Sequence, residues 1–226
     1  MSSARLPGKV LRPVEGRPML AFLLERLDQG LPDTRVVVAT STDESDDPVA
    51  QFCRDENVTC VRGDLQDVAG RFLAALESAG GKGFVRISGD SPLLDAGLVA
   101  QALDLFAETG ADLVTNILER TYPKGMSVEV VSAHAFRRAY AAMRTPDEFE
   151  HVTAHFYKDP AHWKIADFTS GRDLGAINLS VDTAHDFARF EGIVARMTQP
   201  HWSYGLDAVL GLANADRANT DTAVPA

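Results

Sequence analysis

The first nine residues combine hydroxyl, turn-forming and cationic side chains within one short loop. Arg5 and Lys9 flank the turn-forming pair Pro7-Gly8, in a chain whose formal net charge is −10. A local positive patch on an acidic protein suits a small polyanion such as a nucleoside triphosphate. An ordinary solvated loop is the alternative. Only Glu15 opposes the cations of this region, which are Arg5, Lys9, Arg12 and Arg17.

Two aspartates each follow a predicted buried strand. Asp90 comes after the strand expected at 83–88, and Asp182 after the one expected at 176–181. Open α/β sheets bind ligands at the carboxyl ends of their strands, and a carboxylate there can hold Mg²⁺ against a phosphate. The alternative for each aspartate is a helix N-cap, which we expect of Asp95 more than of Asp90. Two aspartates placed alike make a shared metal site plausible.

The sequence lacks the motifs that are typical of several other kinds of site. No G-x-x-x-x-G-K-[ST] phosphate loop and no G-x-G-x-x-G after a strand occurs. His151 and His155 stand four apart on a predicted helix, but the glutamate that follows the first histidine of a zinc protease is absent. We therefore favour a substrate or structural role for His151 over zinc binding. An Asp-x-Asp pair, which a glycosyltransferase would usually show, is also missing around Asp90.

Composition restricts the protein class. The 226 residues are 45% hydrophobic, which is enough for the core of one large domain. No apolar run is long enough to span a bilayer, and no apolar h-region follows Arg5, so we expect a cytoplasmic protein. Cys53 and Cys60 are the only cysteines, too few ligands for a metal site. The acidic balance argues against nucleic acid as a partner.

Strand and helix patterns alternate through the first half, which predicts an α/β fold with a doubly wound, mostly parallel sheet. The expected domain spans 1–213, and the polar, aperiodic segment 214–226 is expected to be a disordered tail. Strands are expected at 35–40, 58–61, 83–88, 112–115, 125–131, 163–168 and 176–181, and helices at 18–29, 47–57, 65–79, 95–109, 133–144, 147–158 and 183–197.

Taken together and in order, several motifs resemble a known family. The chain is similar, over roughly residues 2–198, to the cytidylyltransferases that activate sugar acids, such as the synthetases of CMP-acylneuraminate and CMP-3-deoxy-manno-octulosonate. It most resembles their branch of spore coat polysaccharide biosynthesis proteins. The matching motifs are Ser2-Ser3-Ala4-Arg5-Leu6-Pro7-Gly8-Lys9-Val10-Leu11, Gly89-Asp90-Ser91-Pro92-Leu93, Tyr122-Pro123-Lys124-Gly125-Met126-Ser127-Val128-Glu129-Val130, Glu150-His151-Val152-Thr153 and Val181-Asp182-Thr183.

The resemblance implies a nucleotidyl transfer on a nucleotide-diphospho-sugar transferase fold. A sugar hydroxyl would attack the α-phosphorus of CTP, and pyrophosphate would leave, in surface polysaccharide or glycoconjugate biosynthesis. The residues implied as catalytic are Arg5, Lys9 and Asp90; those on the nucleotide side are Ser3, Arg5, Gly8, Lys9 and Arg71; and Mg²⁺ would be held by Asp90 and Asp182.

The resemblance also implies a sugar side and a quaternary state. Tyr122, Lys124, Glu129 and His151 would line the acceptor site. A lone acid such as Glu129 on an apolar strand could instead face solvent. Segment 116–175 would form the sugar-side and dimerisation insertion of a homodimer.

One departure from the family concerns the sheet. Family members carry a central strand ahead of the Arg5 loop, and the printed sequence contains none, so the first strand is expected to be missing. We expect either that the written start is internal to the natural protein or that the chain is impaired. A nucleotide-binding or scaffolding homologue without activity is therefore an alternative, as is a glycosyltransferase that uses a nucleotide sugar.

Overall fold

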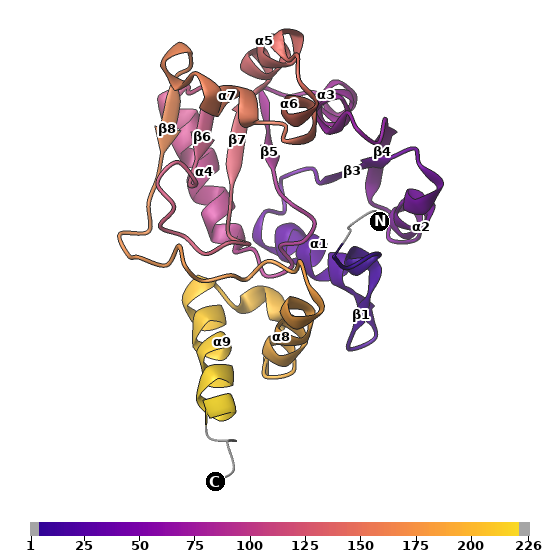
Figure 1. Cartoon of the computed structure of the whole chain (residues 1–226), viewed down its shortest axis with the longest axis vertical. Coiled ribbons are helices and arrows are strands. Elements are labelled where there is room, and N and C mark those ends of the chain that lie inside the picture. The colour runs from indigo at the N-terminus through magenta and orange to yellow at the C-terminus, as the bar shows by residue number, and fades with distance from the viewer. Residues whose placement is uncertain (1–4, 222–226) are drawn as a thin grey trace.

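A four-stranded mixed sheet, at the upper left of Figure 1, is the larger of the sheets. The computed structural model describes residues 5–221, and side chains as far as residue 214. Strand β7 (Glu129–Ser132) lies between β5 (Gly83–Arg86) and β6 (Leu113–Thr115) and is antiparallel to both. Strand β8 (Ile165–Asp167) completes the sheet in parallel with β6.

A second, two-stranded sheet stands apart from the first. Strands β3 (Val37–Ser41) and β4 (Thr59–Gly63) pair in parallel over five residues each. The α/β class is therefore confirmed, but the expected doubly wound, mostly parallel sheet is not what the structure has. These strands fall into two sheets, with β3 at the edge of one and β5 at the edge of the other. In the four-stranded sheet, β7 runs antiparallel to its neighbours β5 and β6. A short hairpin of β1 (Pro13–Val14) and β2 (Arg17–Pro18) follows the Arg5 loop.

Alternation along the strands produces two cores, because successive side chains of a strand point to opposite faces. Val114 and Val130 belong to the larger core, whereas their neighbours Leu113 and Val131 belong to the smaller one. The larger core receives side chains from α1 (Met19–Gly30), α2 (Asp47–Asp55), α4 (Ala96–Thr109), α8 (Ala184–Val194) and α9 (Leu206–Asp221), and the smaller one from α3 (Val68–Ala79), α5 (Ala133–Ala142) and α7 (Ala154–Lys158).

Two expected elements are not formed as continuous units. The helix expected over 147–158 is broken into α6 (Pro146–Glu150) and α7, because Val152 between them has φ 48° and cannot continue a right-handed helix. The strand expected over 176–181 is reduced to an isolated bridge between Lys124 and Asn178. No helix of the described part of the chain is long and apolar enough to cross a membrane.

The C-terminal segment is anchored by a buried arginine. Arg26 of α1 donates to the carbonyl oxygens of Leu94 at 2.8 Å, Tyr204 at 2.6 Å and His201. Helix α9 then continues to Asp221, so the backbone of 214–221 is helical where the sequence predicted an aperiodic tail. Buried Val209 and Leu210 dock the helix against the larger core.

This anchor predicts a loss of stability in mild acid. His201 is 8% exposed, its Nε2 lies 2.8 Å from the Glu25 carboxylate, and burial, together with the charges of Arg26 and Arg17, lowers its pKa to about 4. The unfolded chain therefore binds a proton near pH 6.5 that the folded protein takes up only near pH 4.

The free energy of unfolding should fall by on the order of 2 kcal/mol between pH 7 and pH 4.5 on account of this group. Urea titrations at the two pH values measure the change. H201Q should remove most of this component, while H134Q, at an exposed position of α5, should keep it. An unchanged pH dependence in H201Q would contradict the assignment.

Candidate active site

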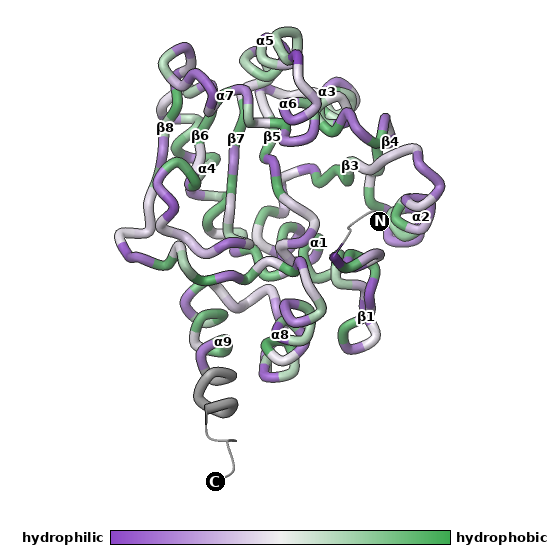
Figure 2. The backbone as a smooth tube through the Cα atoms, in the orientation of Figure 1, coloured by the Kyte–Doolittle hydropathy of each residue, from purple (hydrophilic) through white to green (hydrophobic). Residues whose placement is uncertain are grey.

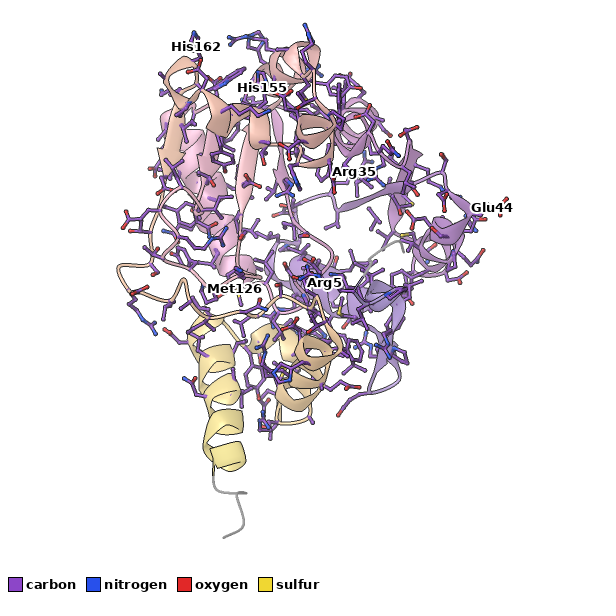
Figure 3. The ribbon with its side chains drawn as sticks, viewed as in Figure 1. Arg5, Arg35, Glu44, Met126, His155 and His162 are labelled. Carbon is purple, nitrogen blue, oxygen red and sulfur yellow. The ribbon has the colours of Figure 1, made fainter. Side chains whose placement is uncertain are left out.

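Four charged side chains from three distant segments meet at the carboxyl ends of the strands. Lys9 Nζ lies 3.1 Å from Asp90 Oδ2 and 3.0 Å from Asp182 Oδ1. Arg5, labelled in Figure 3, approaches the same Asp182 oxygen at 3.2 Å. The Lys9 side chain is 11% exposed, whereas that of Arg5 is 66% exposed. The structure thus brings together residues that are up to 177 positions apart in sequence.

Local structure explains why the N-terminal loop presents Lys9. Leu6 is buried, and its carbonyl accepts from the Lys9 N–H at 3.2 Å. Gly8 has φ 70°, a conformation that favours glycine, and it begins the 3₁₀ turn Lys9–Leu11. This tight turn fixes the base of the Lys9 side chain against the core.

The two acidic segments are tied to each other through the backbone. Val181 N–H donates to the carbonyl of Asp90 at 2.9 Å. The N-cap of α8 is Thr183, in a capping box with Asp186, so the alternative that Asp182 caps this helix is wrong. The expectation that Asp95 caps α4 is confirmed, because its carboxylate accepts from Gly97 N–H at 2.8 Å.

A close backbone contact holds the segment before Asp182 against the Tyr122–Val130 motif. Lys124 N–H donates to Ile177 O at 3.0 Å, and Leu179 N–H donates to Lys124 O at 2.8 Å. Gly125 has φ 89°, and a Cβ atom there would lie 2.7 Å from the Leu179 carbonyl carbon. The glycine is therefore required for the approach that leads the chain to Asp182.

A cavity of about 670 Å³ opens beside Lys9. This volume is within the range of small-molecule sites. Arg71 of α3 lies on its wall, and the buried Arg71 Nε has no hydrogen-bond partner among the described residues. Burial lowers the pKa of Arg71, although the nearby carboxylates oppose the shift. An arginine with an unused buried donor is suited to an anionic or carbonyl-bearing ligand. The other polar or backbone-exposing residues of the wall include Gly8, Lys9, Thr40, Asp46, Gln66, Gly89 and Glu150.

Sequence analysis missed Asp46, a buried carboxylate on the wall of this cavity. Its Oδ2 accepts from the Thr40 hydroxyl at 2.8 Å and from the Ser41 amide at 2.9 Å and hydroxyl at 2.6 Å. Burial acts to raise its pKa, but the hydrogen bonds outweigh it and hold the pKa far below the usual range. The same pattern that singled out Asp90 and Asp182, an acid between a strand end and a helix start, could have found it.

Among the described residues, no hydrogen bond or ion pair joins the residues expected on the acceptor side to one another. Glu129 is 1% exposed and is bound by Arg86 Nη1 and by the Tyr157 hydroxyl, each at 2.6 Å. Tyr122 is packed in the core, with its hydroxyl on Thr169 O at 3.4 Å. The expectation that Glu129 could face solvent is wrong, since the strand end is covered by α7.

The other two acceptor-side residues are exposed. The side chain of Lys124 faces solvent, and His151 pairs with Asp147 at 3.5 Å. His155 pairs instead with Glu148 at 3.0 Å and lies on α7, well away from Arg5 in Figure 3. The assignment of these residues to an acceptor stays a prediction, and Ser3, expected on the nucleotide side, lies outside the described residues.

The residues present fit a magnesium ion bound together with a phosphate. Among the described residues no group of three or more histidine, cysteine or acidic side chains could hold a metal by itself. Mg²⁺ commonly uses only one or two carboxylates and completes its shell with water and substrate phosphates. Asp90 and Asp182 already share one cation, the Lys9 ammonium. Among the residues that the structure describes, Asp90 Oδ1 accepts only the Ser91 hydroxyl, at 3.4 Å.

Comparison with known families decides the classification. Residues 1–203 match the family described as Cytidylyltransferase. The chain belongs to the cytidylyltransferase family. It is 29% identical over 200 residues to the spore coat polysaccharide biosynthesis protein SpsF of Bacillus subtilis, which covers 85% of this chain and 82% of that protein.

Two proteins that are named as cytidylyltransferases support this classification. A 3-deoxy-manno-octulosonate cytidylyltransferase of Mesorhizobium japonicum is 30% identical over 181 residues, 71% of this chain and 72% of the relative. The solved structure of a cytidylyltransferase from Leptospira borgpetersenii serovar Hardjo-bovis superimposes with a TM-score of 0.89 at 26% identity. It covers 98% of this chain and 92% of the solved one, so the divided sheet sits within a nucleotidyltransferase fold.

Proposed function

We propose that this cytidylyltransferase transfers CMP from CTP to a sugar acid or a related sugar, with release of pyrophosphate. The observation that most supports the proposal is that Lys9, on the wall of a cavity of about 670 Å³, is held between Asp90 and Asp182. In this reaction the acceptor hydroxyl oxygen forms a bond to the α-phosphorus, the bond to the pyrophosphate oxygen breaks, and the hydroxyl proton is released.

The charges of the cluster suit such a transfer. Arg5 and Lys9 carry two positive charges, and Asp90 and Asp182 carry two negative ones. The cations would neutralise the triphosphate and the charge that develops on the leaving pyrophosphate, since phosphoryl-type transfer depends mainly on positioning and charge stabilisation. Gly8 and Arg71 on the cavity wall would contact the nucleotide.

Asp90 and Asp182 are the residues that would hold Mg²⁺. The ion would supply neutralisation of phosphate charge and a template for the reacting oxygens. Lys9, bound to both carboxylates, would keep them oriented and then share its ammonium with the phosphates.

The acceptor class rests on the relatives. The name of the Mesorhizobium japonicum protein specifies a sugar acid, and that of the Bacillus subtilis protein specifies polysaccharide biosynthesis. By extension, Tyr122, Lys124, Glu129 and His151 would belong to the acceptor side, and a homodimer is expected from the same resemblance.

The test is a pyrophosphate-release assay on the purified chain. CTP, Mg²⁺ and a panel of sugar acids, including 3-deoxy-manno-octulosonate and N-acetylneuraminate, should give release with at least one acceptor. ATP, GTP and UTP serve as matched controls for the nucleotide. The absence of release with every acceptor, together with no thermal shift on addition of CTP, would support the scaffolding alternative. Cleavage of a nucleotide sugar would support a glycosyltransferase.

Removal of the divalent cation should abolish this activity. EDTA is expected to lower pyrophosphate release at least about 100-fold, and added Mg²⁺ should restore it, because the ion that Asp90 and Asp182 would hold neutralises the phosphate charge. The thermal midpoint without nucleotide should not change, since Lys9 and Arg5 together already neutralise the two carboxylates. Full activity in EDTA would remove the metal from the proposal.

A further inference from the structure

Asp46 is a buried carboxylate that the proposed reaction leaves without a role. It lies on the wall of the cavity beside Lys9 and is 3% exposed. The strand that leads to it, β3, begins with apolar residues, as Figure 2 shows. Three hydrogen bonds from Thr40 and Ser41 reach its Oδ2 and keep it ionised where burial disfavours a charge. A buried charge of this kind acts strongly on charged groups nearby.

Arg71 of α3 is a cation on which this charge acts. Burial lowers the pKa of Arg71, and three carboxylates oppose the shift, Asp46 more than the other two. Those two are Asp64 and Asp67. Asp64 is exposed, and Asp67 caps α3 and accepts from the Tyr140 hydroxyl at 2.7 Å. Asp46 is therefore the buried carboxylate with the largest effect on Arg71, and both residues line the same cavity.

The stem of the Arg71 side chain is placed by the backbone of β4. A Cβ atom at Gly63 would lie 2.8 Å from Arg71 Cγ, so the stem runs directly over this glycine at the end of the strand. Gly63 pairs with Ser41 in the parallel register of β3 and β4, and Ser41 donates to Asp46 through its amide and its hydroxyl. The two strand ends therefore bring the arginine stem and the carboxylate to one place.

The guanidinium of Arg71 retains an unused donor. Its buried Nε has no hydrogen-bond partner among the described residues. A guanidinium is planar and presents its donors at fixed angles, so its orientation decides how well it binds an oxygen-bearing ligand. A fixed negative charge beside the stem restricts that orientation.

We propose that Asp46 is a positioning residue, which orients the Arg71 guanidinium toward a nucleoside triphosphate in the cavity beside Lys9. The identity of the ligand rests on the proposed function, whereas the orientation of Arg71 is a property of the free protein. Asp46 acts through Arg71 and not on the reacting atoms.

The sign of one effect separates this role from a general effect of charge. A carboxylate that only added negative charge to the cavity would repel a triphosphate, so its removal would tighten binding. A carboxylate that orients Arg71 strengthens binding, so its removal weakens it. The two roles therefore predict opposite changes in the Kd for CTP when Asp46 is replaced by asparagine, which has nearly the same shape.

Calorimetric titration of CTP into D46N measures this sign. Without acceptor no turnover occurs, and the Kd for CTP should rise at least about tenfold, while kcat at saturating CTP falls less than about threefold. E44Q is the matched control, because Glu44 is an exposed acid of the same 3₁₀ turn and lies at the outer edge of the molecule in Figure 3. It should leave Kd and kcat unchanged. All assays are run well below the thermal midpoint of each variant.

A double-mutant cycle tests whether the effect passes through Arg71. R71Q should weaken CTP binding by itself, and D46N/R71Q should match R71Q within about twofold, since Asp46 then has no guanidinium to orient. Effects of the two substitutions that simply multiply would contradict the proposal.

Two further measurements depend neither on the folding of D46N nor on catalysis. G63A displaces the Arg71 stem without changing any charge, and it should also weaken CTP binding. The Nε–H resonance of Arg71, assigned by its loss in R71Q, should exchange with solvent at least about fivefold faster in CTP-free D46N than in the wild type.

Unchanged or tighter CTP binding by D46N would overturn the inference, as would an unchanged Arg71 resonance. If D46N does not fold, unchanged CTP binding by G63A overturns it instead. If the wild-type protein bound no CTP, the proposed function would fail. The Arg71 resonance would still decide whether Asp46 orients this arginine.

Discussion

Replacing Asp90 by asparagine is expected to lower CTP-dependent pyrophosphate release at least about 1000-fold. The substitution keeps the shape of the side chain but removes the charge that faces Lys9 at 3.1 Å. Lys9 retains Asp182, at 3.0 Å, so the loop should stay in place. The loss should therefore fall on turnover, and the thermal midpoint should change by only a few degrees.

The control for this variant is a carboxylate elsewhere on the surface. D104N alters an exposed acid of α4 and should leave turnover unchanged. Steady-state rates and thermal midpoints of the three proteins separate a catalytic effect from an unfolding one. If D90N retained wild-type turnover, Asp90 would be removed from the metal site, although the cytidylyltransferase classification would stand.

Replacing Glu129 by leucine is expected to lower the free energy of unfolding by about 3 kcal/mol. Glu129 is fully buried, and its two oxygens accept from Arg86 and Tyr157 at 2.6 Å. Burial and the adjacent carboxylate charge raise the pKa of Tyr157, which therefore stays a protonated donor. Leucine at this position leaves the partly buried Arg86 guanidinium without its counter-charge. A fall of this size in the free energy of unfolding is a large fraction of the stability of a typical domain.

Urea unfolding of matched variants distinguishes charge from packing. E129Q keeps the shape and some hydrogen bonding and should lose less than E129L. The double variant R86M/E129L should recover much of the loss, because no charge is then left unpaired. Equal stability of E129L and wild type would show that the pair contributes nothing. The KM of E129Q for the acceptor tests the separate prediction that Glu129 serves the acceptor side.

Local chemistry made part of the fold predictable. The helices expected over 65–79 and 95–109 are present as α3 and α4, and Asp95 caps α4 as its position suggests. Those features depend on neighbours within a turn or two, which the sequence displays directly. The helix over 147–158 was mispredicted because a single residue, Val152, takes a positive φ that its β-branched side chain does not favour.

The orientation of β7 could not be read from its residues. Its apolar run suits a parallel or an antiparallel neighbour equally, and only the path of the preceding loop reverses it between β5 and β6. Likewise Glu129 has the pattern of a solvent-facing residue until Arg86 and Tyr157, distant in sequence, are brought to it.

The sequence by itself determined the chemical inventory of this cytidylyltransferase: a cationic loop containing Arg5 and Lys9, and two acids, Asp90 and Asp182, each ahead of a helix. Motif order was enough to indicate the family. Only the tertiary structure decided which of these groups meet, that Lys9 is shared by both aspartates, and that the sheet is divided between β3 and β5. The physical reason is that spacing along a chain specifies local geometry, whereas contacts between distant segments depend on how the whole core packs.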